Sequence, residues 1–211
     1  YYEGSLTVAE GVGTQVYHSE YYDVSDFSSW GIPGSLEMKP EITAPGGSIY
    51  SVNGAVKGGQ AYETMSGTSM ASPQVAGMAA VVAQYIRENG LAAKTGLTVR
   101  QLTNSLLMST AEPVIEEATG LPYSVLNQGA GLANVGSAVT ADSYVLVKDN
   151  LSGTASDGKV KAEFGDDPER TGAYSFGFSL NNLTDAAENY TFSAELFTQA
   201  VFEDAYNEAG D

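Results

Sequence analysis

The sequence predicts an α/β fold for about the first two thirds of the chain and a partial all-β sandwich for the rest. Two observations predict the first part: an apolar stretch at Val75–Ile86 that is typical of a buried helix, and a short strand at 42–44 flanked by turn residues. Near residue 141 the helical periodicity stops, and alternating apolar and polar residues follow. We therefore expect one domain at 1–141 and a second at 142–211.

The stretch Val75–Ile86 is the centre of the first part. Only Gln84 interrupts its apolar and glycine residues, so we expect a helix without a polar face, buried through the middle of a domain. Ser69 lies at the start of this helix, and we interpret it as the N-cap. A serine in this place is most often only a cap, so position alone does not assign it chemistry.

The residues around Ser69 nevertheless suit a nucleophile. Gly67 allows a sharp backbone turn because it has no side chain. The first amide groups of a helix lack internal partners and carry the positive end of the helix dipole, so charge that develops on a nearby oxygen would meet donors. Pro73 falls at the fourth helical position if Ser69 is the N-cap, and it has no N–H for the Ser69 carbonyl.

Two ordered matches, one of them in two pieces, resemble one enzyme family. The segment Gly67–Pro73, GTSMASP, resembles the nucleophile signature of the subtilases, the subtilisin-like serine peptidases. The strings FSSWG at 27–31 and KPEITAPGG at 39–47 resemble the segment that precedes the serine in that family. The resemblance covers residues 25–141 and implies the C-terminal portion of a subtilisin-like parallel-sheet domain, with 42–44 in the central sheet.

The resemblance implies a serine endopeptidase that works through an acyl-enzyme. Ser69 would be the nucleophile and its backbone N–H one oxyanion donor, while Gly67 and Thr68 would shape the turn and the oxyanion hole. Subtilases place the catalytic Asp, the His and the oxyanion Asn upstream, and none of these motifs occurs here; His18, the single histidine, stands in an unrelated context. We therefore expect the chain alone to be inactive and a longer parent to be active. The alternative is a degenerate subtilase module that serves as a surface binding or structural platform.

The remaining elements of the first part are short. Asn89-Gly90 is typical of a helix end, and Thr98 of an N-cap that opens an amphipathic helix to about Ser109. The segment Gln128–Val135 resembles the closing segment of subtilase catalytic domains, a glycine turn that leads into a short helix ending near Thr140. These elements predict packing and carry no chemistry of their own.

The second part has the alternation of half-buried strands. The segments Tyr174–Leu180 and Tyr190–Leu196 each alternate apolar with small or polar residues, and Asn181-Asn182 offers a turn between them. We expect these two segments to pair as antiparallel strands of a sandwich. Their place after a subtilase portion resembles the fibronectin type III-like module of the lactocepin-like cell-envelope subtilases.

Composition limits the classes of partner. The chain of 211 residues carries a net charge of −17, which argues against a nucleic-acid partner, because binding phosphates needs clustered Lys and Arg. It contains no cysteine, and no apolar run approaches the roughly 20 residues needed to span a membrane. We expect no cofactor and no readable metal site; the acidic pair Asp166-Asp167 lacks a calcium-loop spacing, although a structural calcium ion stays possible.

The expected partners follow from the resemblance. We expect a protein or peptide substrate, together with an upstream catalytic segment of the same protein. The sequence starts without Met and lacks a leader, so we interpret it as a fragment. An extracellular or cell-surface location is implied by the family resemblance alone.

Overall fold

The structure is a computed structural model that describes residues 23–31, 38–54, 61–147, 157–164 and 167–197. Its elements, in chain order, are β1 (Ile49–Val52), β2 (Tyr62–Met65), α1 (Thr68–Glu88), α2 (Leu91–Thr95), α3 (Val99–Ser109), α4 (Val125–Gln128), α5 (Val135–Thr140), β3 (Ser143–Val147) and β4 (Phe178–Asn182). The mixed helices and strands confirm the α/β class predicted from the sequence. The sheets of the described part are small, with two strands each.

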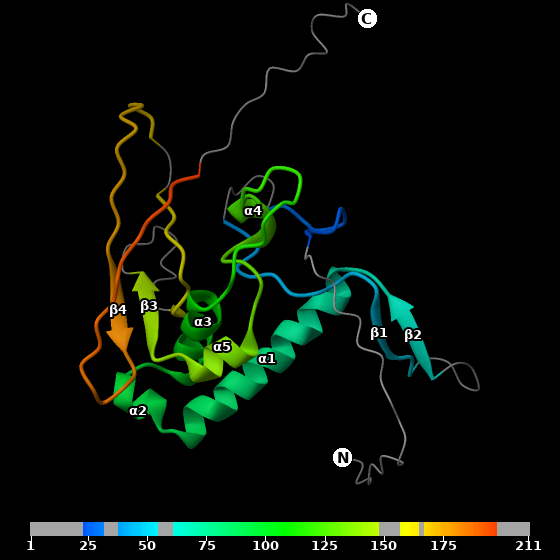
Figure 1. Cartoon of the computed structure of the whole chain (residues 1–211), viewed down its shortest axis with the longest axis horizontal. Helices are drawn as coiled ribbons and strands as arrows, with labels where there is room; N and C mark the ends of the chain where they lie inside the picture. Colours follow the sequence, from blue (N-terminus) through cyan, green and yellow to red (C-terminus); the bar gives the residue numbers. More distant parts are fainter. Residues whose placement is uncertain (1–22, 32–37, 55–60, 148–156, 165–166, 198–211) are drawn as a thin grey trace, which may run out of the picture.

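The long helix α1 runs from the hairpin of β1 and β2 to α2 (Figure 1). The hairpin of β1 and β2 lies at its N-terminal end, and the pair of β3 and β4 lies near the opposite end, beside α2. Asn89 caps the C-terminal end of α1, and Gly90 follows with a φ of 63°, which confirms the predicted helix end.

The prediction that α1 is buried on all sides is wrong for the described residues. Val82 and Ile86 are fully buried, whereas Ala76, Gly77 and Val81 are exposed. Two residues four apart lie on one face of a helix, and this face packs against α3. The opposite face is equally apolar, but none of the described elements covers it.

Helix α3 is built as the sequence predicts. The Thr98 hydroxyl accepts a hydrogen bond from the Gln101 amide at 3.2 Å, and the Gln101 side chain accepts one from the Thr98 amide at 2.9 Å. This reciprocal cap satisfies two of the amides that a helix start leaves without partners. Leu102, Leu106 and Leu107 then recur at spacings of four and one, and all three are buried.

One hydrophobic core joins the two halves of the described chain. Its buried members come from α1, α2, α3, α5, β3 and the residue after β4: Val82, Ile86, Leu91, Leu102, Leu106, Leu107, Ala138, Tyr144 and Leu183. The two core residues beyond 141 pack with the helices of the first part. The division into domains at 1–141 and 142–211 stays a prediction.

The predicted strand at 42–44 makes a parallel contact. Thr43 forms a parallel bridge with Leu132: the Thr43 amide donates to the Gly131 carbonyl, and the Ala133 amide donates to the Thr43 carbonyl, each at 2.8 Å. The closing segment after α4 therefore holds the chain that leads toward β1. Helix α5 ends at Thr140, as predicted.

The predicted pairing of 174–180 with 190–196 is wrong. Strand β4 pairs instead with β3 in antiparallel register, with Ser143 opposite Asn182 and Val147 opposite Phe178. Residues 190–197 form no strand, although the rings of Phe178 and Phe192 stack 5.7 Å apart. Strand β3 offers Tyr144 and Val147 as buried anchors, so pairing with β3 places β4 beside the main core.

The segment 157–164 is attached closely to the first part of the chain. Asp157 pairs with Arg100 at 2.7 Å, and its carbonyl accepts a hydrogen bond from the Asn104 amide at 2.9 Å. Gly158 is buried, with a φ of 71°, and a Cβ added there would lie 2.1 Å from the Gln101 carbonyl oxygen. Only glycine fits so close an approach in this backbone conformation.

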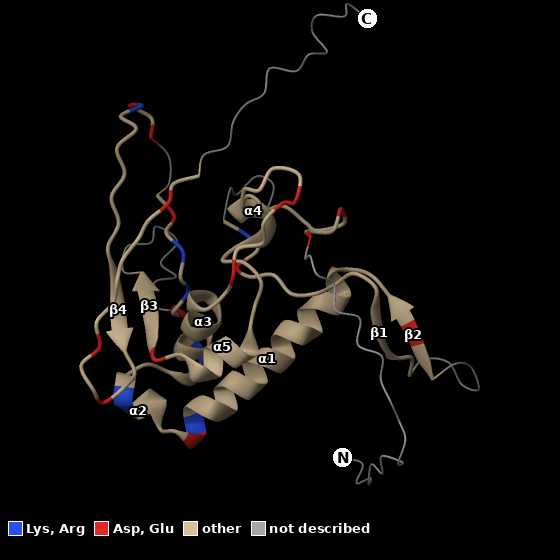
Figure 2. Ribbon diagram, in the orientation of Figure 1, with Lys and Arg blue, Asp and Glu red and all other residues tan. Residues whose placement is uncertain are grey.

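Charged side chains are unevenly distributed (Figure 2). Lys and Arg appear near the C-terminal end of α1, on α2 and along the segment 157–164. Within the described residues 42–54 and 61–86, which contain the hairpin and most of α1, the single charged residue is Glu63. No helix of the described residues is long and apolar enough to cross a membrane.

Candidate active site

Ser69 is exposed and lies in the first turn of α1. The expectation that Ser69 is the N-cap is wrong, because Gly67 holds that position and Thr68 is the first helical residue. Pro73 is therefore the sixth helical residue, yet its missing N–H is still the one that would serve the Ser69 carbonyl. The hydroxyl lies at the surface, as a nucleophile requires, and not in the core.

Backbone contacts form the turn before Ser69. Gly67 has a φ of 154° and a ψ of 163°, a conformation that residues with a side chain rarely adopt. Its amide donates to the Gly46 carbonyl at 2.8 Å, and a Cβ added to Gly46 would lie only 2.8 Å from the Gly67 oxygen. Two glycines therefore let the segment before β1 pass directly behind the turn.

Side chains reinforce this contact on both sides. The Ser66 hydroxyl accepts a hydrogen bond from the Ser48 amide at 2.7 Å. The Gln74 side chain in α1 donates to the Pro45 carbonyl at 2.7 Å. Because these bonds join the segment 45–48 to both flanks of Ser69, the serine sits on a braced turn.

Ser69 lines a pocket of about 350 Å³. The hairpin contributes one wall and the first turns of α1 contribute the other. The lining residues are Ile49, Ser51, Val52, Glu63, Met65, Ser69, Met70, Pro73 and Gln74. A substrate group placed in this pocket would lie beside the hydroxyl.

The start of α1 can stabilise negative charge. The amides of Thr68 and Ser69 belong to the first turn, where helical hydrogen bonding leaves N–H groups without partners. These groups and the helix dipole favour an anion near the hydroxyl. Thr68 is exposed beside them. The arrangement can support an oxyanion, but no histidine is among the described residues that line the pocket.

Glu41 lies shortly before the segment 45–48, which contacts the turn at Gly67. Three lysines lie near its carboxylate. Lys159 pairs with it at 2.7 Å, Lys161 lies 3.8 Å away, and Lys39 is in direct contact. Burial by itself raises the pKa of Glu41, but hydrogen bonds and charge from Lys159 and Lys39 outweigh it and lower the pKa to about 2. Lys161 is buried and also pairs with Glu163 at 2.9 Å.

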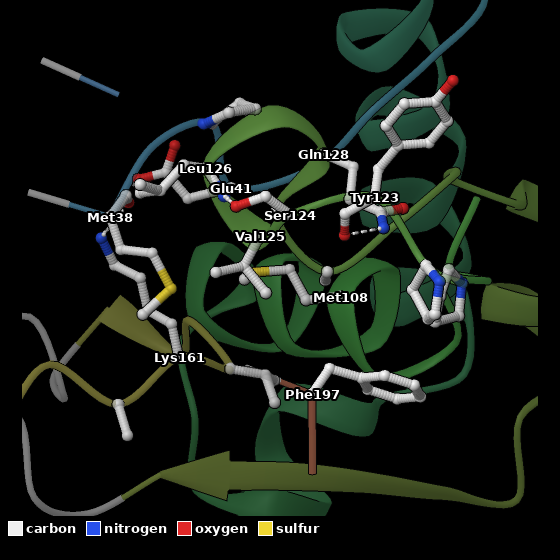
Figure 3. A pocket seen from close by; sticks show the side chains of 17 residues that line it. Met38, Glu41, Met108, Tyr123, Ser124, Val125, Leu126, Gln128, Lys161 and Phe197 are labelled. Atoms are coloured by element: carbon white, nitrogen blue, oxygen red, sulfur yellow. Dashed lines mark hydrogen bonds and ion pairs between the residues drawn. The ribbon is translucent and has the colours of Figure 1, made fainter. Parts of the chain in front are cut away.

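A larger pocket of about 740 Å³ lies elsewhere, and Ser69 does not line it. Figure 3 shows Met38 and Lys161 on one side, Tyr123 on the other, and Met108 and Val125 between them. Its wall is mainly apolar, and Gln128 uses its amide for bonds to Val114 and Tyr123. Size alone does not make it the active site: Ser124 lines it, but this hydroxyl caps α4 by accepting a hydrogen bond from the Leu126 amide at 3.3 Å.

Metal ligation has little support in the part of the chain that the structure describes. No three His, Asp or Glu side chains gather there as a metal site would require. Asp167 instead caps its own turn: it accepts hydrogen bonds from the Gly172 amide at 2.7 Å and from the Thr171 hydroxyl, and the first of these lowers its pKa most. Its neighbour Asp166 lies outside the described residues, as does His18.

The structure brings the three predicted site residues together and adds others. Gly67, Thr68 and Ser69 form one turn, but their catalytic roles stay predictions. Sequence reasoning missed Glu63 and Met65 as pocket residues. The signal was present, because residues two apart in a strand share a face and this strand leads directly to Ser69.

The sequence profile described as the Subtilase family matches residues 4–165. The chain is 32% identical over 191 residues to the PII-type proteinase of Lacticaseibacillus paracasei, and to that of Lactococcus lactis subsp. cremoris. The C5a peptidase of Streptococcus pyogenes is 38% identical over 130 residues. The matches cover 86% of this chain against the proteinases and 61% against the peptidase, but only 9% and 11% of those proteins.

Proposed function

Because the chain belongs to the subtilase family, we propose that it carries the nucleophile segment of a serine endopeptidase, with Ser69 as the nucleophile of the full-length protein. The single observation that carries the proposal is the exposed Ser69 in a pocket, on the first turn of a helix that follows a braced glycine turn. The names of the relatives, proteinase and peptidase, support a protein or peptide substrate.

The proposed mechanism is acyl transfer. The Ser69 hydroxyl oxygen attacks the scissile carbonyl carbon, and its proton passes to a histidine base from the upstream part of the full-length protein. The Ser69 backbone N–H donates to the carbonyl oxygen as it becomes negative. When the C–N bond breaks, the amine leaves with the proton, and water then hydrolyses the ester and regenerates the serine.

The proposal includes a division of labour along the full-length protein. This chain supplies the nucleophile and one oxyanion donor, while the Asp, the His and the oxyanion Asn come from upstream. A serine hydroxyl without a base is a weak nucleophile, so we expect no measurable hydrolysis by the 211 residues alone. For the full-length protein we propose an extracellular or cell-surface location, where a fibronectin type III-like module would follow the catalytic part.

The test is labelling of the full-length protein with a fluorophosphonate probe, which reacts quickly only with an activated serine. We expect stoichiometric labelling that Ser69→Ala abolishes, together with a loss of kcat on the order of 10⁶, the size known for subtilisin itself. Ser72→Ala, an exposed hydroxyl one turn along the same helix, is the matched control and should keep labelling. Absence of labelling in the unaltered full-length protein would favour the degenerate binding module instead.

A further inference from the structure

We propose that Glu63 makes the full-length enzyme prefer substrates with a Lys or Arg side chain at one of the three positions on either side of the scissile bond. This inference rests on the proposed function of Ser69. Its starting observation is that Glu63 and Ser69 line the same pocket of about 350 Å³. Glu63 is also the single charged residue of the described hairpin and of the first five turns of α1.

The hairpin presents Glu63 toward the pocket by its register. Ser51 in β1 lies directly opposite Glu63 in β2, and Ile49 lies opposite Met65. Alternate residues of paired strands share a face, and all four of these residues line the pocket. On the other face, the rings of Tyr50 and Tyr62 stack 5.6 Å apart and hold the two strands together.

A hydrogen bond orients the carboxylate. The Asn53 side-chain amide donates to Glu63 Oε2 at 2.6 Å. An amide donor leaves the negative charge in place, whereas a Lys or Arg partner would cancel it, and no salt bridge links Glu63 to another described residue. The carboxylate is therefore directed by a neighbour and still able to pair with a cation.

The rest of the pocket suits the stem of a long basic side chain. Ile49, Val52 and Met65 line the hairpin side, and Met70 lines the helix side. Lys and Arg lay their methylene groups along apolar surface while their charged ends reach a polar partner. An acidic side chain in the same place would meet a like charge and no cation from the described residues of the hairpin or from the first turns of α1.

The overall charge acts in the same direction. The chain carries a net charge of −17, and a strongly negative protein attracts cationic peptides as they approach. That long-range effect raises the rate for basic peptides in general and does not depend on the position of the basic residue. The proposed effect of Glu63 differs from this long-range effect, because it acts at one position of the substrate.

The experiment uses the full-length protein and a set of internally quenched peptides. Each peptide carries Lys, norleucine or Glu at one of the three positions on either side of the scissile bond. At one position we expect kcat/KM to be higher for Lys than for Glu, and we expect Glu63→Gln to lower this Lys-to-Glu ratio by about 3- to 10-fold. Glu63→Lys should lower the ratio further and reverse the preference.

Glu88→Gln is the matched control. Glu88 is an exposed carboxylate near the opposite end of α1, and it also accepts a hydrogen bond from a side-chain amide, that of Gln84 at 2.7 Å. This variant makes the same change in net charge far from the pocket and should leave the ratio unchanged at every position. An equal fall in Glu88→Gln and Glu63→Gln would mean that net charge alone sets the preference, which would overturn the inference.

The two proposals fail in different ways. Unchanged ratios in both Glu63→Gln and Glu63→Lys, in an enzyme that still cleaves the peptides, would overturn the role of Glu63 and leave the peptidase proposal standing. A full-length protein that cleaves no peptide and does not react with fluorophosphonate would overturn the proposed function, and the inference with it.

Discussion

The two ends of α1 are built differently. At the C-terminal end, Val82 and Ile86 are fully buried against α3 and α5. At the N-terminal end, Thr68, Ser69 and Ser72 are exposed, and the turn is held by backbone and polar contacts with the segment 45–48. One helix therefore joins a packed anchor to an open site.

The contrast separates the part of α1 that stabilises the fold from the part where the proposed chemistry takes place. A buried apolar side chain contributes about 1.5–3 kcal/mol to folding, whereas an exposed hydroxyl contributes little and is free to react. A nucleophile must remain accessible, so its position has to be fixed by structure further along the helix and behind the turn. Substitutions at the two ends of α1, and in the segment behind the turn, therefore test this comparison.

The largest effect on stability is expected at the buried end of α1. Ile86→Ala should lower the free energy of unfolding by about 2–5 kcal/mol, because it removes three buried carbons and leaves a cavity. Val81→Ala, five residues earlier on the exposed face of the same helix, should change it by less than about 0.5 kcal/mol. Urea unfolding of the 211-residue chain measures both, and equal losses would contradict the contrast between the faces.

The next effect concerns the segment that leads from Glu41 to the turn. The pKa of Glu41 falls from 4.5 to about 2 on folding, so its ion pairs stabilise the folded state fully above about pH 5 and lose this contribution as the pH falls toward 2. At about 1.4 kcal/mol per pKa unit this shift corresponds to about 3–4 kcal/mol, and solvent screening of the partly exposed carboxylate lowers the stability change to about 2–3 kcal/mol.

Glu41→Gln should remove this acid-dependent loss, and unfolding by urea between pH 2 and 6 measures it. Lys94→Met is the control, because it removes a different ion pair. Lys94 lies on α2 and pairs with Asp185 at 2.6 Å, and neither residue is near Glu41 in the sequence. Its pH profile should keep the dependence due to Glu41. A profile of Glu41→Gln that equals that of the unaltered chain would contradict the assignment.

The smallest effect is expected from two glycines of α1: Gly67 is its N-cap and Gly77 lies inside the helix. Gly67→Ala should cost about 1–3 kcal/mol, because alanine rarely adopts a φ of 154°. Gly77→Ala should instead stabilise the chain by about 0.5–1 kcal/mol, because its added Cβ meets nothing within 4 Å and alanine favours helices. Thermal unfolding of the two variants gives the signs, and a gain in Gly67→Ala would contradict the braced turn.

The parts of the fold that could be predicted from the sequence depend on local interactions. Helix α3 was predicted because its cap, its periodicity and its end all lie within a dozen residues of Thr98. The turn at Gly67 was predicted because glycine and the first helix amides act locally. The start of α1 nevertheless differs from the prediction, because the helix begins at Thr68 and not after Ser69.

The errors concern contacts between distant segments. Strand β4 was expected to pair with the segment 190–196, but β3 lies 31 residues before β4 and offers buried anchors that alternation within β4 does not reveal. The exposure of one face of α1 was missed for the same reason. Periodicity shows which residues are apolar, but only packing decides which of them find a partner.

The residues of the candidate site also differ in whether local sequence or a distant contact reveals them. Ser69 was identified from a short contiguous string, whereas Glu63 became visible only when the hairpin register placed it in the pocket. Glu41 with Lys159 and Lys161 could not be predicted, because more than a hundred residues separate the carboxylate from these two lysines.

The seat of Gly158 on the carbonyl of Gln101 has a mechanical consequence. A flexible tether would absorb a pull on the downstream part of the protein, but here Asp157 and Gly158 press directly on α3. A pulling force on the residues after 158 would therefore act directly on α3. This helix shares its core with α1, the helix that carries Ser69.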